Sequence, residues 1–250
     1  MSRAEPPGAS DEPDDTGDAE PLERTSLAGA IRHALFDFYH HSIRLVPANV
    51  AWGVLLLALG WGAVQAGLWL TILGLPLLGL PLVGIYRLAG LITRGEEVVL
   101  SDALAAAREQ FVPALAFAAL VAWGLGLLAF NVIGGLNSSS PIGWGLATLA
   151  GWGFVALVIY TVAAWPVLAD PARAADPAQE RARLAGYVVL ASPFRITALT
   201  VVAVALGVVS TIAFAAIVTI TVAYVACLSC RVVLPDADRL AERLAGRRAR

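Results

Sequence analysis

Three long stretches of this chain contain no Asp, Glu or Arg, and they restrict its fold more than any other feature. They cover residues 45–86, 110–169 and 196–230. A helix that crosses the ~30 Å hydrocarbon core of a bilayer needs about 20 apolar residues. The first two stretches are long enough for two crossings each, whereas the third is too long for one and barely long enough for two. Only 14% of the residues are charged, against about 25% in soluble domains. The sequence therefore predicts an all-α polytopic membrane protein.

The positions of the arginines predict the orientation of these crossings. All 17 basic residues are Arg, and they lie before, between and after the three stretches, while the turn expected at 134–143 has none. By the positive-inside rule the segments that carry Arg are cytoplasmic. Both flanks of 196–230 then lie inside, so this stretch crosses an even number of times, with a turn at Gly207 to Thr211. The alternative is one long tilted helix that places the C-terminus outside.

The prediction is thus six transmembrane helices in three hairpins, with both termini in the cytoplasm. The first hairpin is expected to turn near "LGLP", residues 73–76, because Gly74 and Pro76 break helices. We expect the six spans at about 45–70, 75–93, 112–134, 142–169, 193–208 and 211–233.

The two ends of the chain differ from this single membrane domain, which is expected over residues 25–235. Residues 1–24 are rich in Pro, Gly, Asp and Glu. Such a segment buries too little apolar surface to offset its ordering entropy, so we expect a disordered acidic tail. It is no signal peptide, because it lacks a basic start followed by an apolar run. Residues 236–250 are expected to form a basic cytoplasmic tail.

A short amphipathic segment precedes each predicted hairpin and is expected to lie at the cytoplasmic interface. The starts of these helices are predicted at Ser26, Ser101 and Asp176, which are equally spaced along the chain. This spacing suggests an internal repeat, although hairpins and amphipathic linkers also alternate in ordinary polytopic proteins. In the first segment the predicted apolar face carries Leu27, Ile31, Ala34, Leu35, Phe38 and Leu45, and the polar face carries His33, Asp37, His40 and Arg44.

Residues that could carry chemistry are few. Cys227 and Cys230 form a C-x-x-C pair inside an apolar helix, where packing is the expected role rather than redox or metal chemistry. His33 and His40 are two helical turns apart, so one metal ion cannot bridge them. None of the usual catalytic motifs is present. We therefore expect no enzyme activity, no catalytic residue, no cofactor, no metal and no nucleic-acid partner.

The polar and helix-breaking residues inside the predicted spans are the remaining candidates for a site. No Asp, Glu or His lies in the middle of a span, which disfavours an ion-coupled pump. The sequence "GLPLLGLPLVG", residues 74–84, predicts a broken helix, which either borders a binding site, as in transporters, or permits tight packing. The intramembrane polar or structural candidates are Asn49, Gln65, Pro76, Pro81, Arg87 and Asn131.

Several short motifs of the chain resemble those of the YesL-like family of bacterial integral membrane proteins (domain of unknown function 624). These motifs are Asn49-x-x-Trp52, Pro76 with Pro81, Arg94-Gly95-Glu96, Phe111, "WPVLAD" at 165–170 and Pro193. The resemblance covers about residues 27 to 235. It implies a multi-pass protein of the bacterial cytoplasmic (inner) membrane that is accessory to carbohydrate uptake or sensing, with no catalytic residues to carry over.

The function expected from all of this is that of a non-enzymatic membrane protein of unknown biochemical activity. It would work through helix contacts with the lipid bilayer and with another membrane protein, such as a sugar transporter component. The alternative is a permease-like carrier for a small neutral solute. A pocket at mid-membrane lined by Asn49, Gln65 or Asn131 would favour the carrier, and a solid interior would favour the accessory role.

Overall fold

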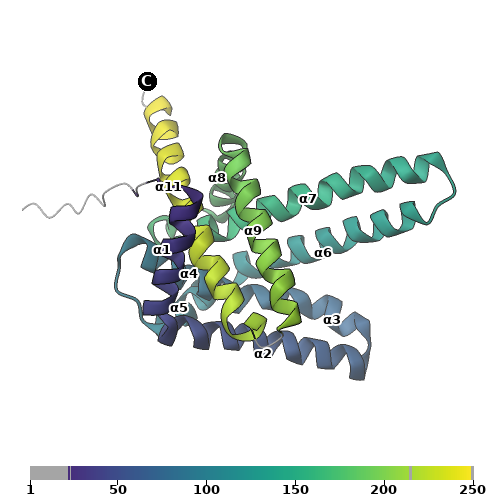
Figure 1. Cartoon of the computed structure of the whole chain (residues 1–250), viewed down its shortest axis with the longest axis horizontal. Helices are drawn as coiled ribbons and strands as arrows, with labels where there is room; N and C mark the ends of the chain where they lie inside the picture. The colour runs from purple at the N-terminus through teal and green to yellow at the C-terminus, as the bar shows by residue number, and fades with distance from the viewer. Residues whose placement is uncertain (1–21, 23, 214–215, 249–250) are drawn as a thin grey trace, which may run out of the picture.

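The computed structural model describes residue 22, residues 24–213 and residues 216–248, and this part of the chain consists of helices joined by short connections, without strands (Figure 1). The predicted all-α membrane fold is confirmed, since six of its helices are long and apolar enough to cross a bilayer. The predicted acidic tail, apart from Leu22 and Arg24, lies outside the described residues. The six candidate spans are Ser42–Ala66, Leu68–Arg94, Phe111–Leu136, Pro141–Ala169, Pro193–Ile212 and Val218–Gly246.

The first pair of spans turns at Gly67, and the prediction of a turn at 73–76 is wrong. Gly67 has φ 92°, a backbone conformation that favours glycine because a Cβ would clash there. The "LGLP" sequence instead runs from the end of α3 into a 3₁₀ segment inside the returning arm, with Pro76 in the first turn of that segment, where a missing N–H is tolerated. The elements are α2 (Ser42–Ala66), α3 (Leu68–Gly74), η1 (Leu75–Leu78) and α4 (Gly79–Arg94).

The second pair, α6 (Phe111–Leu136) and α7 (Pro141–Ala169), turns within the predicted 134–143. Ser140 caps α7 by accepting a hydrogen bond from the Ile142 N–H at 3.3 Å, and Pro141 occupies the first helical turn. This is the arrangement expected of a helix start, where several N–H groups lack backbone partners.

The third pair of spans differs from the prediction both at its turn and at its C-terminal end. Helix α9 (Pro193–Ile212) runs through the turn expected at Gly207 to Thr211. A π-helical segment η3 (Ile217–Thr221) then leads into α11 (Val222–Arg248). The predicted separate tail at 236–250 is corrected as well, because α11 continues through Pro235 to Arg248. The chain beyond Pro193 therefore forms two long helices rather than one.

Short helices and the ends of the long ones form a common base, from which the α2–α3 and α6–α7 pairs extend to the same side (Figure 1). Helices α9 and α11 run across the direction of these two pairs. Helix α11 is central to the base, since 61% of its most apolar window is buried against 11% for α6. The short helices are α1 (Leu27–His40), α5 (Leu100–Glu109), η2 (Pro171–Arg173) and α8 (Ala178–Ala191).

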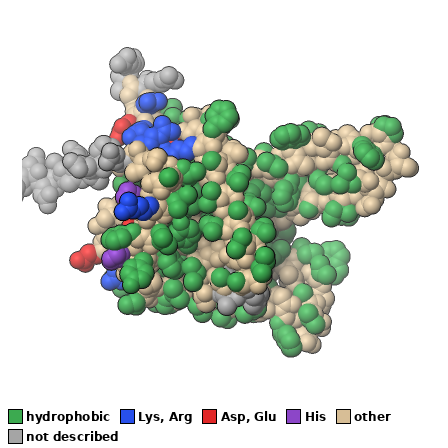
Figure 2. All heavy atoms as spheres, viewed as in Figure 1, with side chains coloured by type: hydrophobic (Ala, Val, Ile, Leu, Met, Phe, Trp, Pro, Cys, Tyr) green, Lys and Arg blue, Asp and Glu red, His purple; other side chains and the backbone are tan. Residues whose placement is uncertain are grey.

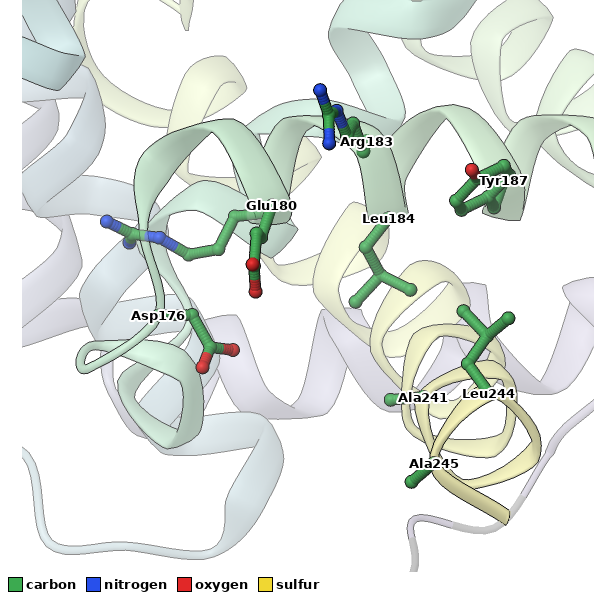
Figure 3. A pocket seen from close by; sticks show the side chains of 9 residues that line it. Asp176, Glu180, Arg183, Leu184, Tyr187, Ala241, Leu244 and Ala245 are labelled. Atoms are coloured by element: carbon green, nitrogen blue, oxygen red, sulfur yellow. The ribbon is translucent and has the colours of Figure 1, made fainter. Parts of the chain in front are cut away.

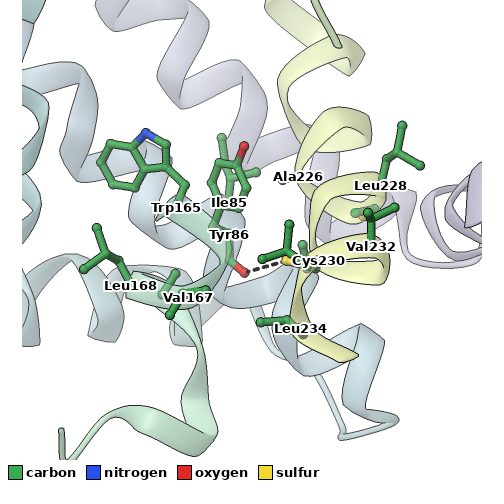
Figure 4. Close-up of a cluster of buried hydrophobic side chains, with 14 of the residues drawn as sticks. Ile85, Tyr86, Trp165, Val167, Leu168, Ala226, Leu228, Cys230, Val232 and Leu234 are labelled. Carbon is green, nitrogen blue, oxygen red and sulfur yellow. Dashed lines mark hydrogen bonds between the residues drawn. The ribbon is translucent and has the colours of Figure 1, made fainter. Parts of the chain in front are cut away.

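The core of the base is apolar and closely packed (Figure 4). Tyr86 of α4 stacks on Trp165 of α7, with ring centroids 6.1 Å apart. Figure 2 shows hydrophobic side chains over the extended pairs and charged and histidine side chains gathered around α1 and the end of α11. The fully buried large side chains are Leu45, Ile85, Leu88, Ile196, Leu199, Leu228 and Leu234.

The amphipathic helices form, but their details differ from the prediction. Ser26 caps α1 as expected, accepting from the Gly29 N–H at 3.2 Å. Helix α5 begins earlier than predicted, with Val99 at its N-cap, and α8 has Pro177 there. The predicted faces of α1 are right for the buried Ala34 and for the exposed His33 and His40. They are wrong for Asp37, which is buried, and for Leu35, which is 59% exposed.

Candidate functional site

Four charged side chains form a closed cluster where α4, α7 and α11 meet. Arg94, at the end of α4, donates from Nε and Nη2 to the two carboxylate oxygens of Asp170 at 2.8 and 2.7 Å. It also donates from Nη2 to Asp238 of α11 at 3.2 Å. Arg173 donates to the same two carboxylates. Two guanidinium groups thus alternate with two carboxylates, and Asp170 is fully buried among them.

Ion pairs at two further points of α11 connect it to other elements. Asp236 accepts from Arg195, at the start of α9, at 3.0 Å and pairs with Arg24 at 3.1 Å. Arg231 binds the Asp37 carboxylate of α1 through two hydrogen bonds of 2.7 and 3.0 Å. This second pair explains why Asp37 is buried, since its charge is compensated. The polar stretch of α11 therefore holds α1, α4, α7 and α9 together.

These ion pairs, which we call the charged base, are suited to fixing helix ends in place. Each carboxylate of the charged base already accepts a hydrogen bond from at least one guanidinium group. These ion pairs therefore offer no uncompensated proton donor or acceptor for catalysis. Removing one partner from such a buried pair leaves an uncompensated charge, which costs about 3–5 kcal/mol. Two residues of the charged base could be found from the sequence, because Arg94 and Asp170 lie in two of the motifs that resemble the YesL-like family. Asp236 and Asp238 were missed, because they were assigned to a separate tail.

Asn49, a predicted polar candidate, is fully buried and joins the first span to the last. Its side chain donates to the Val218 carbonyl at 2.6 Å and accepts from the Ala223 N–H at 2.7 Å. These two backbone groups are five residues apart across the π-helical segment, so the Asn49 amide lies between groups that a regular π-helix would pair directly. Gly53, one turn later, has no room for a Cβ against Val218. Asn49 is therefore used in helix packing.

The other two polar candidates do not join Asn49. Gln65 lies on the exposed surface next to the Gly67 turn. Asn131 is also exposed and donates to the Leu127 carbonyl of its own helix at 2.8 Å. The structure thus disperses the three candidates over the base, a turn and the outside of a hairpin.

The helix-breaking prolines and Arg87 lie along the span Leu68–Arg94, which the 3₁₀ segment η1 interrupts. Pro76 is buried in η1, whereas Pro81 borders a groove between α2, α4 and α5. Arg87 lines a different pocket, of about 310 Å³, with Glu96, Asp102 and other carboxylates of α5 and its preceding loop. The Nη1 of Arg87 is buried without a hydrogen-bond partner among the described residues.

Neither the cysteines nor the histidines form a reactive site. Cys227 and Cys230 are free and at most 1% exposed, and the Cys230 thiol donates to the Tyr86 carbonyl at 3.8 Å (Figure 4). Burial lowers the pKa of His41, and His40 bonds the Phe36 carbonyl of its own helix at 3.0 Å. Among the described residues no group of three or more His, Cys, Asp or Glu is placed to hold a metal ion.

A small cavity of about 260 Å³ lies between α8 and the end of α11 (Figure 3). The carboxylates of Asp176 and Glu180 are at one end of it, and Leu184 and Leu244 approach each other at the other. Arg181 also borders it, and burial lowers the pKa of this guanidinium, which donates to the Leu168 carbonyl. This lining mixes acidic, basic and apolar side chains and indicates no particular reaction.

Comparison of the chain with family models, with curated proteins and with solved structures gave no match.

Proposed function

We propose that this protein is a non-enzymatic accessory subunit of the bacterial inner membrane, which binds another membrane protein through the α6–α7 hairpin. The six apolar helices support its place in a membrane. The dispersal of Asn49, Gln65 and Asn131 and the charged base support a rigid scaffold rather than a solute pathway. The sequence resemblance to YesL-like proteins is what directs the proposal to carbohydrate uptake or sensing as the process served.

The observation that carries the proposal is the low burial of the α6–α7 hairpin, whose two helices contact each other but are little covered by the rest of the described chain. Only 11% of the apolar window of α6 and 17% of that of α7 are buried, against 61% for α11. Gly126 and Gly134 of α6 face open space, with no atom within 4 Å of the place of a Cβ. Small residues on an open helix face let a second helix approach closely in a bilayer. This hairpin therefore offers an open apolar surface for another membrane helix.

The test is affinity purification of the tagged chain from its native membranes in mild detergent. We expect one membrane protein in fixed ratio to the chain, and we expect Gly126→Leu or Gly134→Leu to reduce its recovery. Gly207→Leu is the matched control, since Gly207 of α9 also faces open space. A chain that purifies alone, or a loss that is equal in the control, would contradict the proposal. A partner unrelated to carbohydrate uptake would contradict only the proposed link to carbohydrate uptake or sensing.

The second candidate is a permease-like carrier for a small neutral solute. It is favoured by the broken arm, in which the 3₁₀ segment η1 interrupts the span Leu68–Arg94. Such interruptions free backbone groups that can bind a solute. Reconstitution of the purified chain in liposomes tests this candidate, and solute uptake above that of protein-free liposomes would favour it over the accessory role.

A further inference from the structure

An open apolar groove runs along the outside of the base, between α2, α4 and α5. Its volume is about 690 Å³, which lies within the ~300–1,000 Å³ of typical small-molecule sites. The floor is made of small residues and proline, and the exposed Leu104 and Phe111 form one wall. Its lining residues in α2 and α4 belong to two of the candidate spans, so the groove lies at membrane depth. Those residues are Pro47, Ala48, Ala51, Leu80, Pro81 and Gly84.

Arg108 is the only charged residue that lines this groove. Its side chain has no ion-pair or hydrogen-bond partner among the described residues. Arg44 is exposed and precedes Pro47 and Ala48 by one turn of α2, so it lies on the ridge that leads into the groove. An apolar groove with one unpaired guanidinium group in its lining and a second one turn before it matches a molecule that is apolar along its length and anionic at its head.

The acidic and basic side chains of α5 lie on different sides of the helix. Asp102 and Glu109 line the separate pocket around Arg87, whereas Arg108 lines the groove. Asp102 is also held locally, because its carboxylate accepts from the Val99 N–H at 2.8 Å. The acids of this helix therefore do not neutralise Arg108, and an anion meets a positive charge only on the groove side.

We propose that this groove binds an anionic glycerophospholipid, with one acyl chain along Ala48, Ala51 and Leu104 and the phosphate on Arg108. Arg44 contributes a second positive charge to the headgroup. Basic residues at the end of a site between membrane helices select anionic headgroups, and each contributes about 1 kcal/mol. At tenfold per 1.4 kcal/mol this corresponds to about a fivefold preference for each Arg. A bound lipid would also fill the groove between α2 and α5.

The test is native mass spectrometry of the full chain in detergent with equal amounts of phosphatidylglycerol and phosphatidylcholine of the same chain length. We expect the wild-type protein to retain phosphatidylglycerol in excess. Arg108→Gln should lower the ratio of retained phosphatidylglycerol to retained phosphatidylcholine about fivefold, because only the first headgroup has a net negative charge. Ala51→Phe, which fills the groove, should reduce the retention of both lipids.

Two matched control variants distinguish the loss of this site from the general effect of removing an Arg or adding bulk. Arg183→Gln removes an exposed Arg of α8, and Ala58→Phe adds the same bulk to an exposed position of α2 outside the groove. Equal retention of the two lipids by the wild-type protein would overturn the proposal, as would control variants that behave like Arg108→Gln and Ala51→Phe. A thermal unfolding curve of each variant shows that a loss of lipid is not a loss of fold.

The identity of the occupant is tested in native membranes with a photoreactive residue in place of Leu104, which is 55% exposed. An adduct with the mass of a phospholipid is expected. An adduct with a polypeptide would assign the groove to a protein partner and refute the lipid site. This site lies on α2, α4, α5 and the first residue of α6, and it includes neither Gly126 nor Gly134. Its failure therefore leaves the role proposed for the α6–α7 hairpin untouched.

Discussion

Asp170 is the residue on which the charged base depends most, because its carboxylate accepts from both Arg94 and Arg173. It also accepts from the Ala172 N–H at 3.2 Å and so caps η2. Replacing it with Asn keeps the size of the side chain and removes its charge. Arg94 and Arg173 then face Asp238 alone, which leaves one positive charge without compensation in a site where Asp170 is fully buried.

The expected cost follows from this burial. Removing one partner of a buried ion pair costs about 3–5 kcal/mol, whereas exposed pairs contribute about 0–1 kcal/mol. The Arg94 and Asp170 side chains are 11% and 0% exposed, so the higher range applies. We expect Asp170→Asn to lower the free energy of unfolding by about 3 kcal/mol or more. Asp170→Asn combined with Arg94→Gln should cost less than the sum of the two single changes, because the double variant removes a cation with the anion.

The assay is unfolding in mixed micelles with increasing SDS, followed by tryptophan fluorescence. Trp165 is 4% exposed and lies five residues before Asp170 in the same part of α7, so its emission reports on the base. Asp176→Asn is the matched control, since Asp176 is exposed and forms no salt bridge in the described part of the chain. A change of less than about 0.5 kcal/mol for Asp170→Asn, the range of ordinary surface substitutions, would refute the argument.

Three further predictions concern the packing and the turns. Asn49→Leu should destabilise the fold by about 1–3 kcal/mol in the same assay, because the Val218 carbonyl and the Ala223 N–H lose their partner, whereas Asn131→Leu, on an exposed surface, should change little. Gly67→Ala should cost about 1–2 kcal/mol, since φ 92° is strained for any residue with a Cβ, and Gly126→Ala, in an ordinary helical position, should cost nothing. A single cysteine in place of Ile212, which is 86% exposed, in a variant without Cys227 and Cys230, should react with an impermeant thiol reagent only from the side opposite to a cysteine in place of Arg243.

The number of membrane helices could be predicted from the sequence because it depends on the length of uncharged runs. The turns were harder, because a glycine or proline signals only that a turn is permitted. Gly67 and Gly74 both lie in the first run, and the structure turns at the first of them. Which of the two is used depends on how the returning arm packs, as in the 3.0 Å hydrogen bond from Thr71 to the Leu59 carbonyl. Contacts of this kind leave no local pattern in one sequence.

The burial of Asp37 in α1 and the charged base could not be predicted for a related reason. A periodicity argument places every charged residue on the solvent side, so it assigned Asp37 to the polar face. Asp37 is buried because Arg231, far along the chain, compensates its charge. The same holds for Asp238, which looks like part of a polar tail until its partners Arg94 and Arg173 are known. Buried ion pairs break the rule that burial follows hydropathy, and a pairing between distant residues is invisible to local periodicity.

The charged base also bears on how the third apolar stretch crosses the membrane, by an argument independent of arginine counting. Arg195 and Asp236 flank residues 196–230, and their side chains are 3.0 Å apart. A single helix through a ~30 Å hydrocarbon core would hold its two ends on opposite faces. Two ends joined by an ion pair must lie on the same face, so the stretch returns to the side from which it started. The Thr221 hydroxyl, which donates to Ser210 at 2.6 Å, joins the two arms near the turn.

Arg94 and Asp170 extend the argument to α4 and α7, whose C-terminal ends meet α11 in the same cluster. The C-terminal ends of α4 and α7, the start of α9 and the polar stretch of α11 are therefore held together at the base by ion pairs.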